Sequence, residues 1–240
     1  MTDLEPLPQD WERALVVVAH PDDPEYGVAA AVATWTAAGK DVRYVLATRG
    51  EAGIAGLSPE RSAPAREQEQ IASAAVVGVE VVEFLDHRDG RLVEGPELRR
   101  DLAAAVRRHR PELVVTLNHH ETWGPGAWNS ADHRVLGRCT VDAVADAANE
   151  WIFPELTAHG LAPWRARWVA LASSPRSTHA VDVTDGVEPA VRALAEHRLY
   201  LEALSDDPVQ EQARRQVEWA TAANERFGGR RAVVFELYRT

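Results

Sequence analysis

Four ionisable side chains lie close together in the segment Ala19-His-Pro-Asp-Asp-Pro-Glu25, namely His20, Asp22, Asp23 and Glu25. Carboxylates this close repel one another unless a cation or a catalytic task compensates. One imidazole with carboxylates is a ligand set that suits Zn²⁺ and accepts other divalent ions. The alternative is that the acidic side chains cap a following helix, which stabilises such a helix by up to about 1 kcal/mol. Capping explains one of the acidic residues but not the histidine. The segment therefore favours a metal or catalytic site.

The elements around this segment predict where it lies. An apolar, β-branched run over residues 15–19 is typical of a strand buried on both faces. We expect a helix over 26–38, closed by Gly39, and a second strand over 42–48. Strand, helix and strand make a right-handed βαβ unit. His20 then emerges at the carboxyl edge of the sheet, where ligands of doubly wound folds bind.

The alternation continues along the chain. We expect helices over 64–77, 96–108, 132–148, 187–203 and 208–226, and strands over 80–85, 113–117, 168–172, 180–183 and 232–238. No repeat or compositional break divides residues 1–240, so we predict a single α/β domain. Its sheet should be doubly wound, Rossmann-like and mostly parallel, with helices on both faces and a helical C-terminal part at about 187–227. Two long loops, 50–62 and 119–130, are expected to carry function.

Composition and charge exclude several classes of protein. The net charge is −11 and no dense Lys or Arg cluster occurs, which argues against nucleic acid or an anionic membrane as partner. No apolar run reaches the ~20 residues of a membrane helix, and the acidic start does not resemble a secretory signal. No G-x-G-x-x-G follows the first strand, which argues against a nucleotide-binding Rossmann domain. We expect a cytoplasmic protein with a small-molecule substrate, and a buried, inert thiol at Cys139.

The segment Ala19–Glu25 resembles the signature of the PIG-L/LmbE-like zinc-dependent N-acetylglucosaminyl deacetylases. The stretch Leu46-Ala-Thr-Arg-Gly-Glu-Ala-Gly53 resembles the family's T-x-G-E-x-G loop. Further matches follow in the family's order and span nearly the whole chain. They are Arg66-Glu67, Asp89-Gly90-Arg91, Ala131-Asp132-His133-Arg134, Thr178-His-Ala-Val-Asp-Val-Thr184 and the helix containing His197.

The resemblance implies a metal site built from His20, Asp23 and His133, holding Zn²⁺ or another divalent ion. Three protein ligands leave one coordination position for water, as in catalytic zinc sites. Asp22 would be the general base. The implied reaction removes an N-acetyl or similar N-acyl group from an amino sugar or a related small metabolite. Relatives are often multimeric, so a homo-oligomer is also implied.

The resemblance further implies that Arg66 and Asp89 contact the substrate, although Arg66 could instead be an exposed residue of a helix's first turn. Glu25 is expected to support the loop or a metal ligand. Asp132 is expected to orient His133.

Two tryptophans, Trp123 and Trp128, are held by Gly and Pro in the loop 119–130. They are suited to stacking on a sugar face or to forming an apolar acyl pocket. They could instead anchor the loop to the core or lie at a subunit contact.

The chain departs from the family at Ser130. Many relatives have His-Pro-Asp-His where this chain has Ser130-Ala-Asp-His133, and that first histidine stabilises the oxyanion or protonates the leaving amine. A serine can donate a hydrogen bond but cannot serve as an acid near neutral pH. His119 and His120, just after the strand 113–117, are the two candidates to compensate, and we favour His120. The alternative is that both are solvent-facing loop histidines.

Two other functions stay open at this point. An amidase of a thiol-sugar conjugate would be favoured by a larger apolar pocket beside the two tryptophans. A metal-binding relative with little hydrolase activity would be favoured by the serine at position 130.

Overall fold

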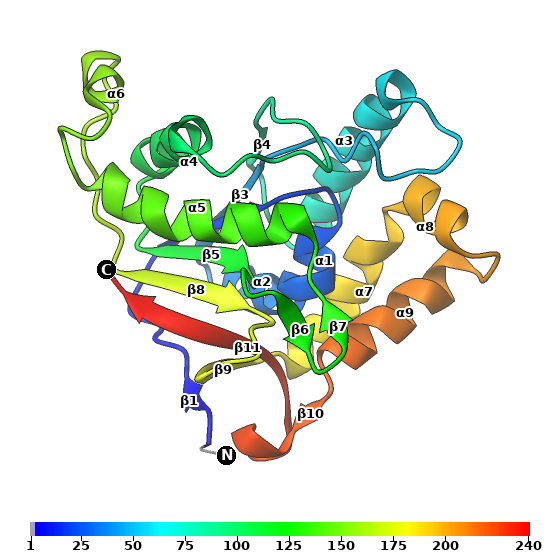
Figure 1. The fold of residues 1–240 in the computed structure, drawn as a ribbon. Coiled ribbons are helices and arrows are strands. Elements are labelled where there is room, and N and C mark those ends of the chain that lie inside the picture. The colour runs from blue at the N-terminus through cyan, green and yellow to red at the C-terminus, as the bar shows by residue number, and fades with distance from the viewer. Residues whose placement is uncertain (1–2) are drawn as a thin grey trace.

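A large twisted sheet forms the centre of the protein, shown in Figure 1 as a computed structural model that describes residues 3–240. The strand order is β1-β9-β11-β8-β5-β2-β3-β4, and β10 pairs with β11. The strands are β1 (Glu5–Pro6), β2 (Arg13–Val18), β3 (Asp41–Leu46), β4 (Val82–Phe84), β5 (Leu113–Leu117), β8 (Trp168–Ala172), β9 (His179–Asp182), β10 (Ala223–Asn224) and β11 (Arg230–Arg239). A separate hairpin consists of β6 (Thr122–Gly124) and β7 (Ala127–Trp128).

The middle of the sheet is parallel, as the sequence predicts. β2 pairs in parallel with β3 and β5, β3 with β4, and β5 with β8. β11 runs antiparallel to both β8 and β9. The central strands β2 and β5 are almost entirely buried because helices cover both faces of the sheet, which is why they read as continuous apolar runs.

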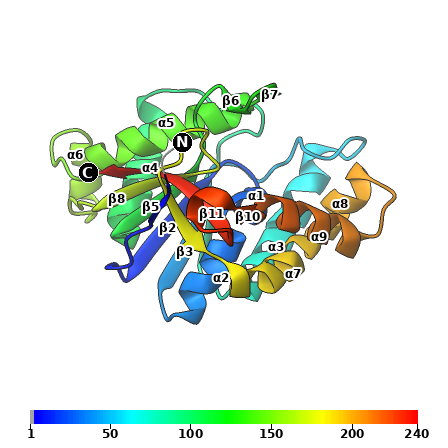
Figure 2. The ribbon, with the colours of Figure 1, turned by 90° about the horizontal axis from the view of Figure 1, so that it is seen from below.

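Helices lie on both sides of the sheet, as Figures 1 and 2 show. They are α1 (Asp23–Gly27), α2 (Ala29–Ala37), α3 (Pro59–Val76), α4 (Pro96–His109), α5 (Ala131–Ala147), α6 (Pro154–Ala158), α7 (Val187–Ala195), α8 (Arg198–Leu204) and α9 (Val209–Ala220). Alternate residues of β2 enter different cores. Val16 packs with side chains of α2, α7 and α9 on one face, and Leu15 with side chains of α4 and α5 on the other.

Four predicted helices differ from the observed ones. The helix expected over 208–226 ends at Ala220, and the strand β10 follows it. The helix expected over 26–38 is two helices, because the backbone leaves helical geometry at Val28 (φ −136°). The helix expected over 187–203 is also divided, at His197, into α7 and α8. α3 begins at Pro59 because that proline, and not Pro64, takes the first helical position.

The loop expected over 119–130 contains the hairpin β6–β7. Cys139 is buried, as expected. Among residues 3–240, no helix combines the length and apolar character needed to cross a bilayer.

Candidate functional site

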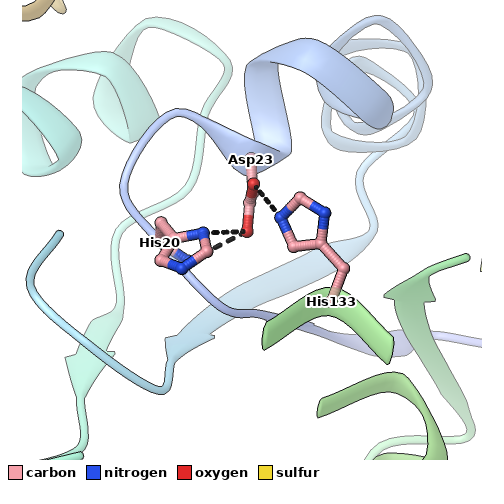
Figure 3. Close-up of side chains that lie close together, drawn as sticks. All are labelled: His20, Asp23 and His133. Carbon is pink, nitrogen blue, oxygen red and sulfur yellow. Dashed lines mark hydrogen bonds and ion pairs between the residues drawn. The ribbon is translucent and has the colours of Figure 1, made fainter. Parts of the chain in front are cut away.

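Three side chains from separate elements meet at the carboxyl edge of β2 (Figure 3). His20 follows β2, Asp23 begins α1, and His133 lies in the first turn of α5. Asp23 Oδ1 is 2.9 Å from His133 Nε2, and Asp23 Oδ2 is 3.5 Å from His20 Nδ1. Ligand atoms of the three residues all lie within 4.8 Å of one another, so one ion could contact all of them.

The loop between β2 and α1 is folded around the Asp23 carboxylate. Asp23 Oδ2 accepts hydrogen bonds from the backbone N–H groups of Ala19 (3.0 Å) and His20 (2.9 Å). The preceding residue, Asp22, has a left-handed backbone (φ 84°), which is rare for a residue with a side chain. Its N–H donates to Gln70 Oε1 at 2.9 Å. These backbone contacts fix the direction in which each carboxylate of the loop points.

The ring nitrogens that face away from Asp23 also have partners. His133 Nδ1 lies 3.2 Å from Asn129 Oδ1. His20 Nε2 lies 3.1 Å from both Asp132 and Asp89. Asp132 therefore contacts His20, and the expectation that it orients His133 is wrong, because the bond from His133 goes to Asn129 instead.

The set formed by His20, Asp23 and His133 has the chemistry of a divalent-metal site. Zn²⁺ binds histidine nitrogen at about 2.0–2.1 Å, which requires ligand atoms a few ångströms apart, as they are here. Metal-binding histidines usually bond through the second ring nitrogen to a carboxylate or amide oxygen, and both rings do so.

A second group, His20 with Asp89 and Asp132, has similar spacing. In that group Asp132 Oδ2 already accepts the Gly90 N–H (2.7 Å), and Asp89 Oδ2 accepts the Ala52 N–H (2.8 Å). Both carboxylates contact His20 through Nε2, at 3.1 Å, and not through the ring nitrogen that faces Asp23.

The charges of the three residues depend strongly on one another. Burial raises the pKa of Asp23, but the charges of His133 and His20 outweigh it, and the pKa falls well below its usual range. Burial lowers the pKa of His20, but Asp23 and the hydrogen bonds to Asp132 and Asp89 raise it well above its usual value. Asp23 is thus an anion, as a metal ligand must be.

Asp22 is buried beside these groups. Burial raises the pKa of its carboxyl to about 6, the Arg66 charge opposes this rise, and the Asp23 charge adds to it. Asp22 Oδ2 lies 3.0 Å from Arg66 Nη2. A carboxylate with such a pKa is mostly ionised at neutral pH and can also take up a proton, as a general base requires.

The Arg66 guanidinium is buried, with 2% of the residue exposed. Its Nη2 donates to the Pro21 carbonyl (2.6 Å) and its Nη1 to the Gly50 carbonyl (3.2 Å). A Cβ at Gly50 or Gly53 would lie 2.4 or 2.3 Å from Nη1, so the guanidinium occupies space that only glycines leave. The structure therefore places Arg66 beneath the signature loop, which corrects the exposed first-turn alternative. Direct contact of Arg66 with the substrate stays a prediction.

Glu25 supports the loop, in agreement with the sequence analysis. It accepts a hydrogen bond from Gln70 (3.2 Å), the residue that also binds the Asp22 N–H. Its Oε2 lies 3.1 Å from Nε2 of His197, and both side chains are fully buried. Sequence reasoning did not link His197 to Glu25, because the two residues are far apart in the chain.

The residues considered for the missing family histidine have other contacts. Ser130 caps α5 by accepting the His133 N–H at 3.1 Å. His120 Nε2 is 2.7 Å from Glu236 Oε2 on β11, a carboxylate that also accepts the Ser174 hydroxyl. The contact with β11 uses Nε2 of His120, and the compensating role of this residue stays a prediction.

The two tryptophans of the hairpin differ in their surroundings. Trp123 is half-buried and meets His133 edge-on, with ring centroids 5.5 Å apart. Trp128 is 65% exposed, and Arg134 lies over its ring at 4.8 Å. Both tryptophans therefore contact the first turn of α5, which carries His133.

Comparisons with known proteins agree with this geometry. Residues 15–144 match the family described as PIG-L, GlcNAc-PI de-N-acetylase. The chain is 28% identical over 190 residues to a diacetylchitobiose deacetylase of Thermococcus kodakarensis, which covers 78% of this chain and 70% of that relative.

A second relative is a 1D-myo-inositol 2-acetamido-2-deoxy-alpha-D-glucopyranoside deacetylase of Kineococcus radiotolerans. It is 31% identical over 229 residues, covering 82% of this chain and 59% of the relative, so this chain spans less than two thirds of that protein. Among solved structures, N,N'-diacetylchitobiose deacetylase from Pyrococcus horikoshii has a TM-score of 0.84 and 26% identity, covering 96% of this chain and 85% of that one.

Proposed function

The chain belongs to the PIG-L, GlcNAc-PI de-N-acetylase, family, and from this premise we propose that it is a zinc-dependent hydrolase. We propose that it removes the N-acetyl group of an amino sugar or a related small metabolite, giving a free amine and acetate. The observation that carries the proposal is the placement of one carboxylate, Asp23, between His20 and His133, with the separate carboxylate of Asp22 buried beside them.

His20, Asp23 and His133 would hold the cation, and each imidazole has a partner that fixes its ring. Zn²⁺ bound at this position would supply Lewis-acid polarisation of the amide carbonyl and would lower the pKa of water. The ligand set would also accept another divalent ion.

Asp22 would act as the general base. It accepts a proton from the attacking water, and the amide carbon becomes tetrahedral. The same carboxyl can then pass that proton to the leaving nitrogen. This second step matters here because Ser130 cannot supply a proton near neutral pH.

An acetamido sugar is the proposed substrate class. The relatives named above are deacetylases of diacetylchitobiose and of an inositol acetamido-glucopyranoside. Asp89, with a carboxylate beside His20, and the tryptophans of the hairpin are the residues we propose to meet the sugar. Trp128 offers an exposed aromatic face to a part of the substrate beyond the acetamido ring.

Metal analysis combined with an acetate-release assay tests the proposal. Purified wild type, Asp22→Asn and His133→Ala would be compared on N-acetylglucosamine, diacetylchitobiose and a GlcNAc-inositol. We expect bound zinc and turnover in the wild type, bound zinc without turnover in D22N, and loss of zinc in H133A. A wild type that binds zinc but hydrolyses none of the substrates would contradict the proposed hydrolase activity. It would favour a metal-binding relative with little activity.

The same assay distinguishes the proposed deacetylase from the alternative amidase. Turnover of a thiol-sugar conjugate in preference to the acetamido sugars would favour that reading. A cytoplasmic location and a homo-oligomer stay predictions from the sequence.

A further inference from the structure

Asp22 has the position of a helix cap but not the usual conformation of one. It is the N-cap residue of α1, and its carbonyl accepts the N–H groups of Glu25 (2.9 Å) and Tyr26 (3.0 Å). An N-cap aspartate usually has an extended backbone and a side chain that accepts an N–H of the first turn. Asp22 is left-handed (φ 84°), and its side chain caps none of the N–H groups of α1, a helix that the structure describes in full. The carboxylate is therefore available for other contacts.

The helix α3 contacts Asp22 at two points. Gln70 Oε1 accepts the Asp22 N–H at 2.9 Å, and Arg66 Nη2 lies 3.0 Å from Asp22 Oδ2. Arg66 and Gln70 are both buried, and they lie on the same face of α3 because they are four residues apart. One side chain of α3 thus binds the backbone of Asp22, and the other binds its carboxylate.

The partners of Gln70 determine the orientation of its amide group. Its oxygen faces the Asp22 N–H, and its nitrogen donates to the Glu25 carboxylate, 3.2 Å from Oε1 and 3.4 Å from Oε2. A rotated amide would place its NH2 group against the Asp22 N–H and its oxygen against a carboxylate, and both pairs repel. A carboxylate at position 70 would also have an oxygen against Glu25. The two contacts together therefore require a glutamine.

Glu25 is held for this contact by the C-terminal helical part of the chain. Its Oε2 lies 3.1 Å from Nε2 of His197, the residue at the break between α7 and α8. The side chains of Glu25 and His197 have no exposed surface, and Gln70 is equally inaccessible. A buried polar group that loses its partner is left without water to replace it, which is costly. Each of these three side chains therefore depends on the next.

We propose that Gln70 is a positioning residue, which holds Asp22 in its left-handed conformation and so keeps its carboxylate available as general base. This inference rests on the proposed function. The proposed reaction assigns different tasks to two adjacent aspartates, and the backbone at Asp22 determines the angle between their side chains. Asp23 has contacts of its own, because its Oδ2 accepts the N–H groups of Ala19 and His20. Loss of the Gln70 contact should therefore disturb the base and not the metal ligand.

Gln70→Glu keeps the size of the side chain and places an oxygen against Glu25. We expect kcat for acetate release to fall by roughly 10- to 100-fold, since a small misplacement of a reacting group reduces rates by this order. KM should stay within about twofold, because the proposed contacts with the sugar do not include Gln70. Zinc content should equal that of the wild type. The matched control is Gln68→Glu, the same change at an exposed position of α3.

Two results would contradict the positioning role. Equal kcat values in Q70E and Q68E would show that the contact with the Asp22 N–H does not affect the base. Loss of bound zinc together with activity in Q70E would show that Gln70 supports the metal site as a whole and not the base alone. A lower kcat with full zinc content and an unchanged KM is the result that a merely structural role would not give.

Exchange of the two partners tests the hydrogen bonds without any turnover. The variants are Gln70→Glu, Glu25→Gln and their combination, each unfolded by heat as purified. In the combination, the carboxylate at position 70 accepts the Asp22 N–H, and the amide at position 25 donates to that carboxylate and accepts from His197. We expect Q70E to lower Tm and the added E25Q to restore part of the loss, because the exchange re-forms the hydrogen bonds that Q70E breaks. A double variant with a Tm no higher than that of Q70E would overturn the proposal.

The two experiments separate a failure of this inference from a failure of the proposed function. A wild type without acetate release would overturn the proposed function and the catalytic part of this inference, while a restored Tm in the double variant would still support the contacts of Gln70. An active wild type without that restoration would overturn this inference alone.

Discussion

Asp132 contacts His20 across the site, with 3.1 Å between Asp132 Oδ2 and His20 Nε2, although its neighbour in the chain is His133. The same carboxylate accepts the backbone N–H groups of Gly90 (2.7 Å) and Leu92 (3.2 Å). Asp132 thus connects three segments, which are the signature loop, the loop after β4 and the first turn of α5. Its contacts give the His20 ring one orientation and leave Nδ1 facing Asp23.

This relationship predicts the effect of Asp132→Asn on metal binding. The amide keeps the size of the side chain but removes the charge that holds the His20 ring. Loss of such a partner typically costs about 10- to 100-fold in metal affinity. Zinc affinity would be measured by competition with a chromophoric chelator. The matched control is Asp142→Asn, at an exposed position of the same helix, and equal affinities in the two variants would contradict the role of Asp132.

The sequence predicted the fold best at the strands that are buried on both faces of the sheet. β5 and β8 have the predicted bounds, because a strand covered on both faces must be apolar throughout. Since β2 was expected to end near His20, the sequence also predicted where the signature loop emerges. The proximity of His20, Asp23 and His133 was implied by the family resemblance, and the structure brings the three residues together.

Partners of individual side chains could not be predicted in the same way. Whether Asp132 contacts His133 or His20 depends on the angle at which α5 packs against the loop after β4. The spacing of residues along one helix does not determine that angle. The alternative of an exposed Arg66 in a helix's first turn is wrong, because the burial of this arginine depends on the space beside Gly50 and Gly53, which lie in another segment. The contact of the Arg66 guanidinium with the Tyr200 ring, 4.3 Å from its centroid, was missed because the chain breaks at His197, which changes the direction of the following helix.

Ser130→Ala should reduce stability through the N-terminus of α5. The Ser130 hydroxyl accepts the His133 N–H at 3.1 Å, and losing such a cap costs about 0.5–2 kcal/mol. Urea unfolding of the zinc-free protein would measure the change. Ser58→Ala is the control, because Ser58 occupies the N-cap of α3 without accepting a hydrogen bond from that helix. A loss in S130A no larger than in S58A would show that the cap contributes nothing.

Glu83 should make stability depend on pH in the acidic range. Burial raises the pKa of this carboxyl, but the hydrogen bond with His109 and the Arg108 charge outweigh it and hold the pKa below its usual value. A lowered folded-state pKa stabilises the protein above the unfolded-state pKa, about 4.3 for glutamate, and this stabilisation is lost as pH falls through the folded-state value.

The free energy of unfolding should therefore differ between wild type and Glu83→Gln more at pH 7 than well below pH 4. Urea titrations at the two pH values would measure both differences. Glu80→Gln, at an exposed position just before β4, provides the comparison for a general change in charge. The same wild-type-to-E83Q difference at both pH values would contradict the assignment.

Gly53→Ala should displace the arginine that holds the proposed base. The backbone at Gly53 is not left-handed, so alanine is allowed there, but its Cβ would lie 2.3 Å from Arg66 Nη1. Overpacking of this kind costs about 1–3 kcal/mol, and the guanidinium can relieve it only by leaving its contacts with Pro21, Gly50 and Asp22. Because those contacts fix the signature loop, we expect lower stability together with a lower kcat.

The control is Gly95→Ala, where the backbone is extended (φ 171°) and a Cβ would meet nothing within 4 Å. If G53A and G95A had the same stability in urea unfolding and the same rate of acetate release, the space at Gly50 and Gly53 would not be what keeps Arg66 against Asp22.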